Sequence, residues 1–581
     1  MKIKHLNINL FFLIFIIFFS QLSVSAHNLP KNYFRSPVDF KITLSGTFAE
    51  LRNNHFHAGI DIRTFTTGKK VYAVADGVVS RIKISAGGYG KALYIDHPNG
   101  YTSVYAHLSK FSPKIEAFIK SQQYQNKKFE IDINLNKLES HKKEQFKLKK
   151  GNIIAYSGNT GSSMGPHLHF EIRETKSEEP INPMLLGFKI LDTTSPKIYN
   201  LYVYPLNKKS SVNEKNTRQV FKVSSQSKNS YILKTAKMKL HGKIGFAIHT
   251  LDFLDNTWGK CGINKLELKI NDSLVTNYSL NKFSFNESSY INSHIDYELN
   301  HKAKRKIHKA FIEPNNKLNF YSEMQSDGSY EFKENKTYKI DFSVYDSYQN
   351  KAKLKFTVKG DTTSVKFPEK EYTSLFKYQN ENHFSQEGIE LKFPKNCLYK
   401  DMNFKYSSTK DSNFMSPIHH IHRPTVALNR HYSISLKVNP IDESLTDKLV
   451  MSQIDEDGKV SSAGGIYING YVKAKTKKLG NYAISIDTIP PSVTTKTDYK
   501  NKNIKNLKFI DFTIKDDLSG IKSYHGEIDN KWVLFEFDKK KNRLFYTFDK
   551  SRLQRNKKHK LKLIVKDAVG NIGNYTCDFT W

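Results

Sequence analysis

The sequence predicts a mainly β protein built from several domains, and three observations lead to this prediction. The chain has 581 residues, which is too long for a single hydrophobic core. Aromatic residues are frequent, with 32 Tyr and 39 Phe, and aromatic side chains favour strands. Short alternating apolar and polar runs, punctuated by Gly and Pro, recur along the chain, as in antiparallel sheets.

Composition and charge narrow the class of protein. Hydrophobic residues make up 38% and charged residues 25% of the chain, a balance typical of folded domains. The formal net charge is +35 at pH 7, which suits nucleic acid or another anionic surface. The lysines are spread over the whole chain without an arginine-rich aromatic module, so we predict no nucleic-acid partner. If the charge holds the protein near an anionic envelope, added salt should weaken that binding.

The N-terminus has the layout of a secretory signal peptide over residues 1–26. Lys2 and Lys4 precede an apolar run over residues 10–19, and small residues end the segment at Ala26. The uninterrupted apolar run is shorter than the roughly 20 residues that span a bilayer. We therefore predict an exported protein, in the periplasm or at the cell envelope or exterior, without a stable membrane span after cleavage.

Cysteine usage restricts how a metal could be held. Cys261, Cys397 and Cys577 are odd in number and far apart, so neither a disulfide framework nor a Cys-x-x-Cys zinc site is expected. Any bound metal must then have histidine and carboxylate ligands.

Three histidine-bearing stretches lie in the first third of the chain. In "NNHFHAGIDIR", His57 and Asp61 flank Gly59, which favours a strand or turn over a helix. In "DHPNGYTSVYAHLSKF", Asn99-Gly100 predicts a hairpin whose return strand carries His107. In "YSGNTGSSMGPHLHFEIR", a Gly/Ser/Asn turn precedes a strand that places three residues on one face, His167, His169 and Glu171. Together they supply three N/O ligands and spare imidazoles, as catalytic zinc requires.

The motifs "HFHAGIDI", "YAHL", "GNTG" and "GPHLHFEIR", in this order, resemble those of the lysostaphin-type (LytM-like) zinc metallopeptidases, which cut peptidoglycan cross-bridges. The resemblance covers about residues 34–190. It implies a small antiparallel β-sheet domain of the duplicated hybrid motif type that binds Zn2+. The implied ligands are His57, Asp61 and His169, and the implied catalytic histidines are His107 and His167, whose division of roles stays open.

For the remaining candidate residues, the sequence either leaves two roles open or predicts no function. Glu171 either orients a metal ligand or forms a plain ion pair. His55 makes a second His-x-His with His57 but does not fit the spacing to Asp61, so we expect it to be exposed. The run "SPIHHIHRP" contains three histidines in a loop-like segment between prolines, and we predict no metal there: His419, His420 and His422.

Weak repeats suggest the domain organisation. "DTTSPKI" at residue 192 is echoed by "DTTSVKF" at 361 and "DTIPPSV" at 487, and each reads as a linker into a new β-domain. We expect a metallopeptidase domain over 27–190 with an insertion at 111–150, which begins with a helix at Pro113 and continues with a strand over 129–135. Immunoglobulin-like domains are expected over 191–362 and 488–581, and a further β-domain over 363–487.

These expectations predict an exported zinc metalloendopeptidase that hydrolyses the peptide cross-links of peptidoglycan. The substrate class, cross-linked stem peptides, follows from the resemblance. Two alternatives stay open: a non-enzymatic module that binds the wall or regulates another hydrolase, and a metalloprotease that acts on an envelope protein. The β-domains are candidate binding sites for an envelope protein. The bond cleaved, the oligomeric state and the effect of the insertion on substrate choice are left open.

Overall fold

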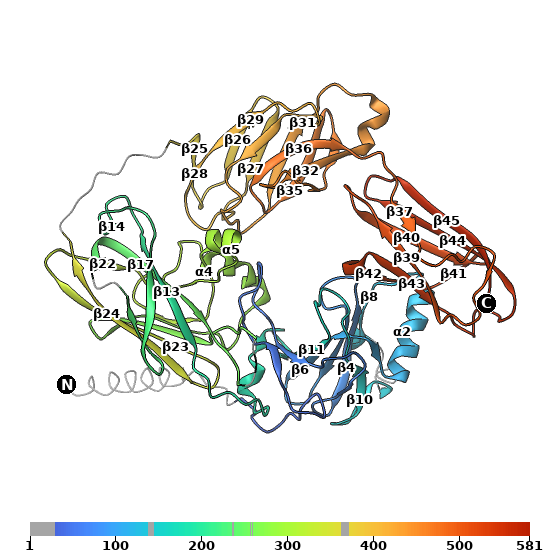
Figure 1. Cartoon of the computed structure of the whole chain (residues 1–581), viewed down its shortest axis with the longest axis horizontal. Helices are drawn as coiled ribbons and strands as arrows, with labels where there is room; N and C mark the ends of the chain where they lie inside the picture. Colours follow the sequence, from blue (N-terminus) through green and yellow to red (C-terminus); the bar gives the residue numbers. More distant parts are fainter. Residues whose placement is uncertain (1–28, 138–143, 235–236, 256, 258, 362–370) are drawn as a thin grey trace, which may run out of the picture.

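The computed structural model describes residues 29–137, 144–234, 237–255, 257, 259–361 and 371–581. The predicted signal peptide, residues 1–26, lies outside them. The chain is built mainly of strands arranged in several sheets, which confirms the predicted mainly β class (Figure 1). Within the described part of the chain, no helix combines the length and apolar character needed to cross a membrane.

The N-terminal unit, residues 29–190, contains two antiparallel sheets. The larger sheet has nine strands: β1 (Leu44–Gly46), β2 (Ile60–Arg63), β4 (Gly77–Ile84), β5 (Lys91–Asp96), β6 (Tyr101–Leu108), β8 (Ile131–Asn134), β9 (Lys147–Leu148), β11 (His167–Glu174) and β12 (Pro180–Ile181). Its order is β1-β2-β11-β6-β5-β4-β8, with β12 beside β11 and β9 beside β4. The smaller sheet contains β3 (Lys70–Tyr72), β10 (Ile153–Tyr156) and β7 (Lys110–Phe111) in that order.

The predicted hairpin and helix are both present in this unit. Gly100 has a φ of 82° and turns the chain between the antiparallel strands β5 and β6. Helix α2 (Pro113–Asn126) starts with proline at its first turn and buries Ile115 and Ile119. The next strand, β8, pairs with β4 and begins two residues later than predicted, so this segment extends the large sheet at its edge.

The second unit, residues 191–361, is dominated by a twelve-stranded sheet. Its strands are β13 (Lys197–Pro205), β14 (Ser211–Val212), β15 (Gln219–Ser227), β16 (Ser230–Leu233), β17 (Lys239–Leu251), β18 (Lys265–Ile270), β19 (Ser273–Ser279), β20 (His308–Lys309), β21 (Tyr321–Met324), β22 (Tyr330–Phe332), β23 (Thr337–Tyr345) and β24 (Lys351–Gly360). Two short helices, α4 (Ile291–His294) and α5 (Tyr297–Ala303), lie between β19 and β20 in sequence.

The third unit, residues 371–487, contains one two-stranded and two five-stranded sheets. Its strands are β25 (Ser374–Phe376), β26 (Asn382–Gln386), β27 (Ile389–Phe393), β28 (Met402–Phe404), β29 (Tyr406–Thr409), β30 (Ile418–Ile421), β31 (Tyr432–Lys437), β32 (Leu449–Ile454), β33 (Val460–Ser462), β34 (Ile466–Ile468), β35 (Tyr471–Thr476) and β36 (Gly480–Ile486).

The C-terminal unit, residues 488–581, contains a four-stranded and a five-stranded sheet. Its strands are β37 (Ser492–Thr494), β38 (Lys502–Asn503), β39 (Phe509–Lys515), β40 (Ile521–Ile528), β41 (Lys531–Trp532), β42 (Glu536–Asp538), β43 (Arg543–Thr547), β44 (Lys558–Asp567) and β45 (Ile572–Thr580). The immunoglobulin-like assignment of this unit and of the second unit, and the exact domain boundaries, stay predictions.

Some residues of the first two units pack into the hydrophobic core of the other unit. Each unit has its own buried cluster, but Phe48, Phe56 and Ala58 belong to the core of the second unit. In the opposite direction, Leu254 and Cys261 of the second unit pack into the core of the N-terminal unit. The first two units therefore share an interface that includes the segment carrying His57.

The chain curls so that its C-terminal unit returns to the N-terminal unit, where β42 and β43 lie near β8 and α2 (Figure 1). Lys120 Nζ on α2 lies 2.6 Å from Asp549 Oδ2. The guanidinium of Arg552 stacks 3.4 Å above the ring of Tyr124, whose edge meets Trp532. Part of the predicted insertion is thus a contact surface between the N-terminal and C-terminal units.

Candidate metal centre

The pairing of β2 with β11 brings the predicted metal ligands together. In this antiparallel pair His169 lies directly opposite Asp61, so both side chains extend from the same face of the sheet. His57 precedes β2, and the close approach of its segment to β11 depends on Gly59. A Cβ at Gly59 would lie 2.3 Å from the carbonyl oxygen of Phe170, so only glycine fits this position.

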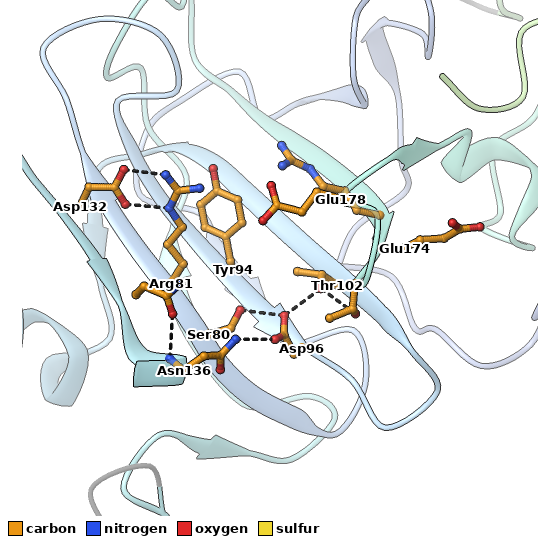
Figure 2. Close-up of a pocket in the computed structure, with 12 residues that line it drawn as sticks. Ser80, Arg81, Tyr94, Asp96, Thr102, Asp132, Asn136, Glu174 and Glu178 are labelled. Atoms are coloured by element: carbon orange, nitrogen blue, oxygen red, sulfur yellow. Dashed lines mark hydrogen bonds and ion pairs between the residues drawn. The ribbon is translucent and has the colours of Figure 1, made fainter. Parts of the chain in front are cut away.

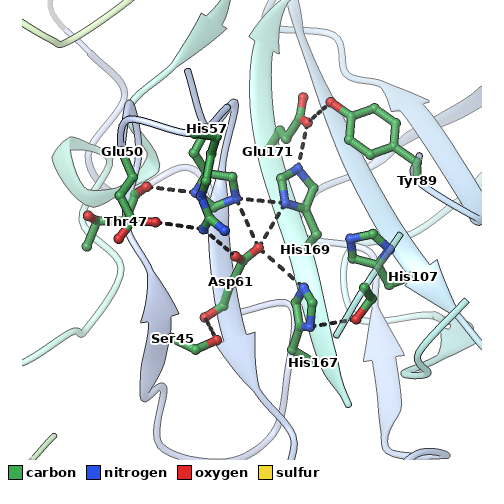
Figure 3. A network of polar contacts seen from close by, with 12 residues as sticks. Ser45, Thr47, Glu50, His57, Asp61, Tyr89, His107, His167, His169 and Glu171 are labelled. Atoms are coloured by element: carbon green, nitrogen blue, oxygen red, sulfur yellow. Dashed lines mark hydrogen bonds and ion pairs between the residues drawn. The ribbon is translucent and has the colours of Figure 1, made fainter. Parts of the chain in front are cut away.

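Three donor atoms converge at this point (Figure 3). Nε2 of His57 lies 3.0 Å from Asp61 Oδ1 and 3.0 Å from Nδ1 of His169. Nδ1 of His169 lies 2.9 Å from the same Asp61 oxygen. Two imidazole nitrogens and one carboxylate oxygen are a ligand set that suits Zn2+, and they leave a fourth position open. These three residues can therefore hold a metal ion.

The outer nitrogen of each ligand imidazole already has a hydrogen-bond acceptor. His57 Nδ1 lies 2.7 Å from the carbonyl oxygen of Thr47, and His169 Nε2 lies 2.7 Å from Glu171 Oε1. Each outer nitrogen therefore donates its proton, which leaves the inner lone pair free for a metal. The second oxygen of Glu171 accepts from Arg173 Nε at 2.6 Å. Glu171 thus both orients a ligand and forms an ion pair.

Electrostatics around the three donors favour a bound cation. Burial opposes ionisation of Asp61, but His57 and the other two histidines hold its pKa well below the usual range. Burial also opposes a charge on His169, yet hydrogen bonds to Asp61 and Glu171 raise its pKa to about 9. Against burial, Arg173 and His169 lower the pKa of Glu171 to about 2. A metal binding here would displace the proton of His169, so metal affinity should depend on pH.

His107 and His167 lie beside the donors, and the glycine-rich turn before β11 orients both rings. Nδ1 of His107 donates to the carbonyl oxygen of Thr160 at 2.9 Å, and Nδ1 of His167 donates to that of Gly165 at 2.9 Å. Their ring centroids are 4.8 Å apart, and His167 Nε2 lies 3.4 Å from Asp61 Oδ1. Burial, together with His169 and His167, lowers the pKa of His107 to about 3. The Nε2 atom of His107 is therefore an unprotonated base at neutral pH.

Several contributing residues carry no recognisable motif. Arg52 Nη2 lies 3.0 Å from Asp61 Oδ2 and 2.7 Å from Glu50 Oε2, so it holds the carboxylate oxygen that faces away from His57. Tyr89 stacks on His169 and donates to Glu171. The second unit also supports the site, because Phe56 N donates to Ser288 Oγ at 3.2 Å. Sequence analysis missed all of these residues.

The structure also places the histidines that were predicted to lie outside the site. His55 is exposed, as expected. His419 and His420 lie on strand β30 rather than in a loop, because this segment pairs with β29 and β36. His419 Nδ1 shares a hydrogen bond with Tyr406 OH, and His420 Nδ1 donates to Asn481 Oδ1. Among the described residues, they and His422 belong to no group that could hold a metal ion.

A polar cavity of about 440 Å3 lies further along the face of the large sheet that carries His169 and Glu171 (Figure 2). Alternate residues of β11 share this face, so the same strand links the metal donors to Arg173 at the cavity. Arg81 forms an ion pair with Asp132 of β8 there, at 2.6 Å. The segment predicted as an insertion therefore lines this cavity through Asp132, Asn134 and Asn136.

The fold and the donor set thus define a small β-sheet domain able to hold a metal ion through two histidines and an aspartate. Residues 55–124 and 130–183 match Peptidase family M23, so the chain carries an M23 peptidase domain and the resemblance to LytM-like peptidases is confirmed. The match is interrupted only at 125–129 and otherwise runs through the segment 111–150. Residues 373–487 match a Zu5-like domain.

Relatives of the N-terminal unit are named as peptidases. The chain is 35% identical over 138 residues to the DD-carboxypeptidase/endopeptidase Mpg of Neisseria meningitidis serogroup B, a match covering 24% of each chain. It is 29% identical over 178 residues to the peptidoglycan DD-endopeptidase ShyA of Vibrio cholerae serotype O1, covering 29% of this chain and 33% of that one. The matches therefore span a quarter to a third of these relatives.

Two solved structures show similarity over the same region. A zinc-containing peptidase from Vibrio cholerae matches with 25% identity and a TM-score of 0.19, covering 26% of this chain and 39% of that one. The catalytic domain of lysostaphin from Staphylococcus simulans matches with 23% identity and a TM-score of 0.17, covering 24% of this chain and 86% of that one.

Proposed function

We propose that this chain is an exported zinc metalloendopeptidase that hydrolyses the peptide cross-links of peptidoglycan. The convergence of His57, Asp61 and His169 beside two further histidines is the observation that carries the proposal. The similarity to ShyA, a peptidoglycan DD-endopeptidase, supports the substrate class, and the similarity to Mpg, a DD-carboxypeptidase/endopeptidase, supports peptide-bond hydrolysis. Envelope localisation follows from that substrate and from the predicted signal peptide.

His57, Asp61 and His169 are the proposed zinc ligands, since their inner donor atoms converge and their outer atoms have fixed partners. When bound, zinc supplies Lewis-acid polarisation of a peptide carbonyl and makes a water molecule more acidic. Only three protein ligands are proposed, so the fourth position of a tetrahedral zinc ion would stay open for water or substrate.

His107 and His167 are the proposed catalytic residues, and they handle protons and the developing negative charge. Because Nδ1 of His107 donates to the Thr160 carbonyl, its Nε2 presents the lone pair that would accept a proton from the attacking water. A protonated imidazole can then donate to the leaving amine. His167, whose Nε2 faces Asp61, is placed to stabilise charge on the carbonyl oxygen.

The surface around the site offers candidate contacts for a substrate. Met164, just before β11, and Phe65, just after β2, are exposed apolar side chains, with exposed fractions of 101% and 76%. The polar cavity beyond Arg173 presents charged and hydroxyl side chains to an extended peptide.

The test is digestion of isolated cross-linked sacculi by the mature protein, starting at His27, with the released peptides resolved by mass spectrometry. We expect conversion of cross-linked dimers to monomers. His169→Ala should abolish this conversion together with zinc binding. His107→Ala should abolish the conversion but retain zinc, because His107 is not a proposed ligand.

A matched control is His55→Ala, which removes an exposed histidine two residues from His57 and should leave both readouts unchanged. Zinc binding without peptide release by the wild type would contradict the proposal. It would favour a wall-binding or regulatory module, or a protease acting on an envelope protein.

A further inference from the structure

Three aspartates meet where the N-terminal and second units join. Asp192 lies before the first strand of the second unit, Asp252 directly follows β17, and Asp346 directly follows β23. One carboxylate oxygen from each can be chosen so that all three lie within 4.8 Å of one another. All three side chains are buried, with exposed fractions of 8%, 2% and 1%.

Nothing in the described part of the chain compensates this negative charge fully. Asp252 Oδ1 and Asp192 Oδ2 are buried and have no hydrogen-bond partner among the described residues. A buried carboxylate without a partner is costly. Burial, together with Asp192 and Asp346, raises the pKa of Asp252 to about 8. Two carboxylate oxygens of the cluster are therefore buried without a donor, and a cation bound by the three carboxylates would supply the missing partner.

The same arrangement occurs a second time, at the junction of the third and C-terminal units. Asp487 lies before β37, Asp516 follows β39, and Asp567 ends β44, and they also form a group of three within 4.8 Å. The positions correspond to those of the first cluster along the repeated sequence.

The hydrogen bonds made by one asparagine correspond in the two clusters, although Asp487 Oδ2, unlike Asp192 Oδ2, accepts a bond, from Ser519 N at 3.1 Å. Asn350 Nδ2 donates to Asp346 Oδ2 at 2.6 Å and to the carbonyl oxygen of Asp192 at 3.1 Å. Asn571 Nδ2 donates in the same way to Asp567 Oδ2 at 2.8 Å and to the carbonyl oxygen of Asp487 at 2.9 Å. One asparagine therefore holds two of the three aspartates in place in each unit, and the third aspartate faces them.

We propose that the first cluster, Asp192, Asp252 and Asp346, binds Ca2+, and that the second cluster, Asp487, Asp516 and Asp567, forms an equivalent site. Hard cations take oxygen ligands, and calcium accepts six to eight of them in flexible geometry, some of them from water and backbone carbonyls. Neither cluster includes a nitrogen or sulfur ligand, so zinc is disfavoured relative to the His-containing centre.

The first site connects the second unit to the metal centre through short contacts. Asp252 and Cys261 form a two-way backbone bridge, with N···O distances of 3.0 and 2.8 Å. Gly262 N donates to Thr47 Oγ1 at 3.3 Å, and the carbonyl oxygen of Thr47 holds His57. An ion at this junction would fix the second unit against the segment that carries a proposed zinc ligand.

The test is calorimetric titration of Ca2+ into the metal-free mature protein. We expect about two ions per chain for the wild type, about one for Asp252→Asn, about one for Asp567→Asn and none for the double variant. Asp272→Asn, which changes an exposed aspartate in a turn of the second unit, is the matched control and should retain two. Asp61→Asn, in the His-containing centre, should also retain two, which separates this proposal from the proposed catalytic function.

Thermal unfolding gives a second readout that does not depend on stoichiometry. Asp252→Asn replaces a carboxyl that burial and the neighbouring Asp192 and Asp346 already disfavour as an anion, so without calcium this variant should unfold at the wild-type temperature or higher. Calcium should raise the midpoint of the wild type more than that of the variant. Absence of calcium binding at millimolar concentration, or an unchanged stoichiometry of two in the double variant, would overturn the proposal.

Discussion

Each imidazole in the metal centre has one ring nitrogen committed to a fixed acceptor. The acceptors are backbone carbonyls for His57, His107 and His167. Only His169 uses a side chain, Glu171, which is itself held by Arg173. The orientation of His169 is therefore the one that a single side-chain substitution can change.

Glu171→Gln should lower zinc affinity about 10–100-fold, the usual effect of losing a carboxylate behind a ligand histidine. An amide is a weaker acceptor for His169, and it leaves the buried Arg173 without an opposite charge. Competition with a chromophoric chelator measures the affinity. Arg173→Gln removes the same ion pair but keeps the bond to His169, so it should lose stability with a smaller loss of zinc affinity. Equal affinities in both variants and the wild type would contradict this role.

The residues of the centre differ in how far the sequence predicts them. His57, Asp61 and His169 carry recognisable spacing, because an alternating strand and a glycine-containing turn leave a pattern in the sequence. Arg52 and Tyr89 leave none. They reach the site through side-chain length and sheet pairing, and arginine and tyrosine are common on any surface. Their roles follow only once β11 and its neighbours are in register.

At the scale of elements, the pairing of β2 with β11 depends on the close approach of the backbone at Gly59 to the backbone of β11. Gly59→Ala places a methyl group 2.3 Å from the carbonyl oxygen of Phe170, so the segment carrying His57 must move. We expect a loss of about 1–3 kcal/mol of unfolding free energy, as for other overpacked sites, together with weaker zinc binding. Urea unfolding and zinc stoichiometry measure the two effects. Gly165→Ala is the control, since nothing lies within 4 Å of its added carbon.

Helix α2 shows that local sequence predicts an element but not its long-range contacts. Its start at Pro113 and its buried stripe were predictable from local sequence, because proline at the first turn and apolar spacing are local signals. Its contact with Asp549 and Arg552 was not, because the partner lies more than 400 residues away in sequence. For the same reason, the predicted boundary at residue 190 does not reveal that Phe56 packs into the second unit.

The buried His308 on strand β20 should make the folded protein less stable in acid. Burial lowers the pKa of His308 to about 3, below the ordinary value of 6.5. The unfolded chain therefore binds the extra proton between about pH 6.5 and 3, and the stability contributed by neutral His308 is lost as pH falls through that window. At pH 5 this amounts to on the order of 1–2 kcal/mol.

His308→Gln should remove this pH-dependent part. The fall in urea midpoint between pH 7.5 and pH 5 should be smaller in this variant than in the wild type. The exposed His383 serves as the control, and His383→Gln should behave as the wild type does. An unchanged pH dependence in His308→Gln would show that His308 is not the group responsible.

At the scale of the whole molecule, the C-terminal unit contacts the N-terminal unit beside the metal centre. Lys540 of the C-terminal unit donates to the carbonyl oxygens of Asn159 and Ser163, the latter at 2.8 Å. Both carbonyls belong to the glycine-rich turn that orients His107 and His167. Lys91 of the N-terminal unit, itself buried, lies 2.9 Å from Glu536 in the same interface. The C-terminal unit thus contacts the site through its supporting turn rather than through the metal donors.

Lys540→Ala should therefore lower the turnover number several-fold without changing zinc stoichiometry. Removing the ammonium leaves two turn carbonyls without their donor, so the acceptors that orient His107 and His167 become less fixed, and a small displacement of a catalytic group is costly. Steady-state hydrolysis of a soluble cross-linked peptide measures the effect, and Lys541→Ala, which changes the exposed neighbouring lysine, should match the wild type. A rate increase in Lys540→Ala would contradict this role, because it would mean that the C-terminal unit obstructs the path of the substrate instead of supporting the turn.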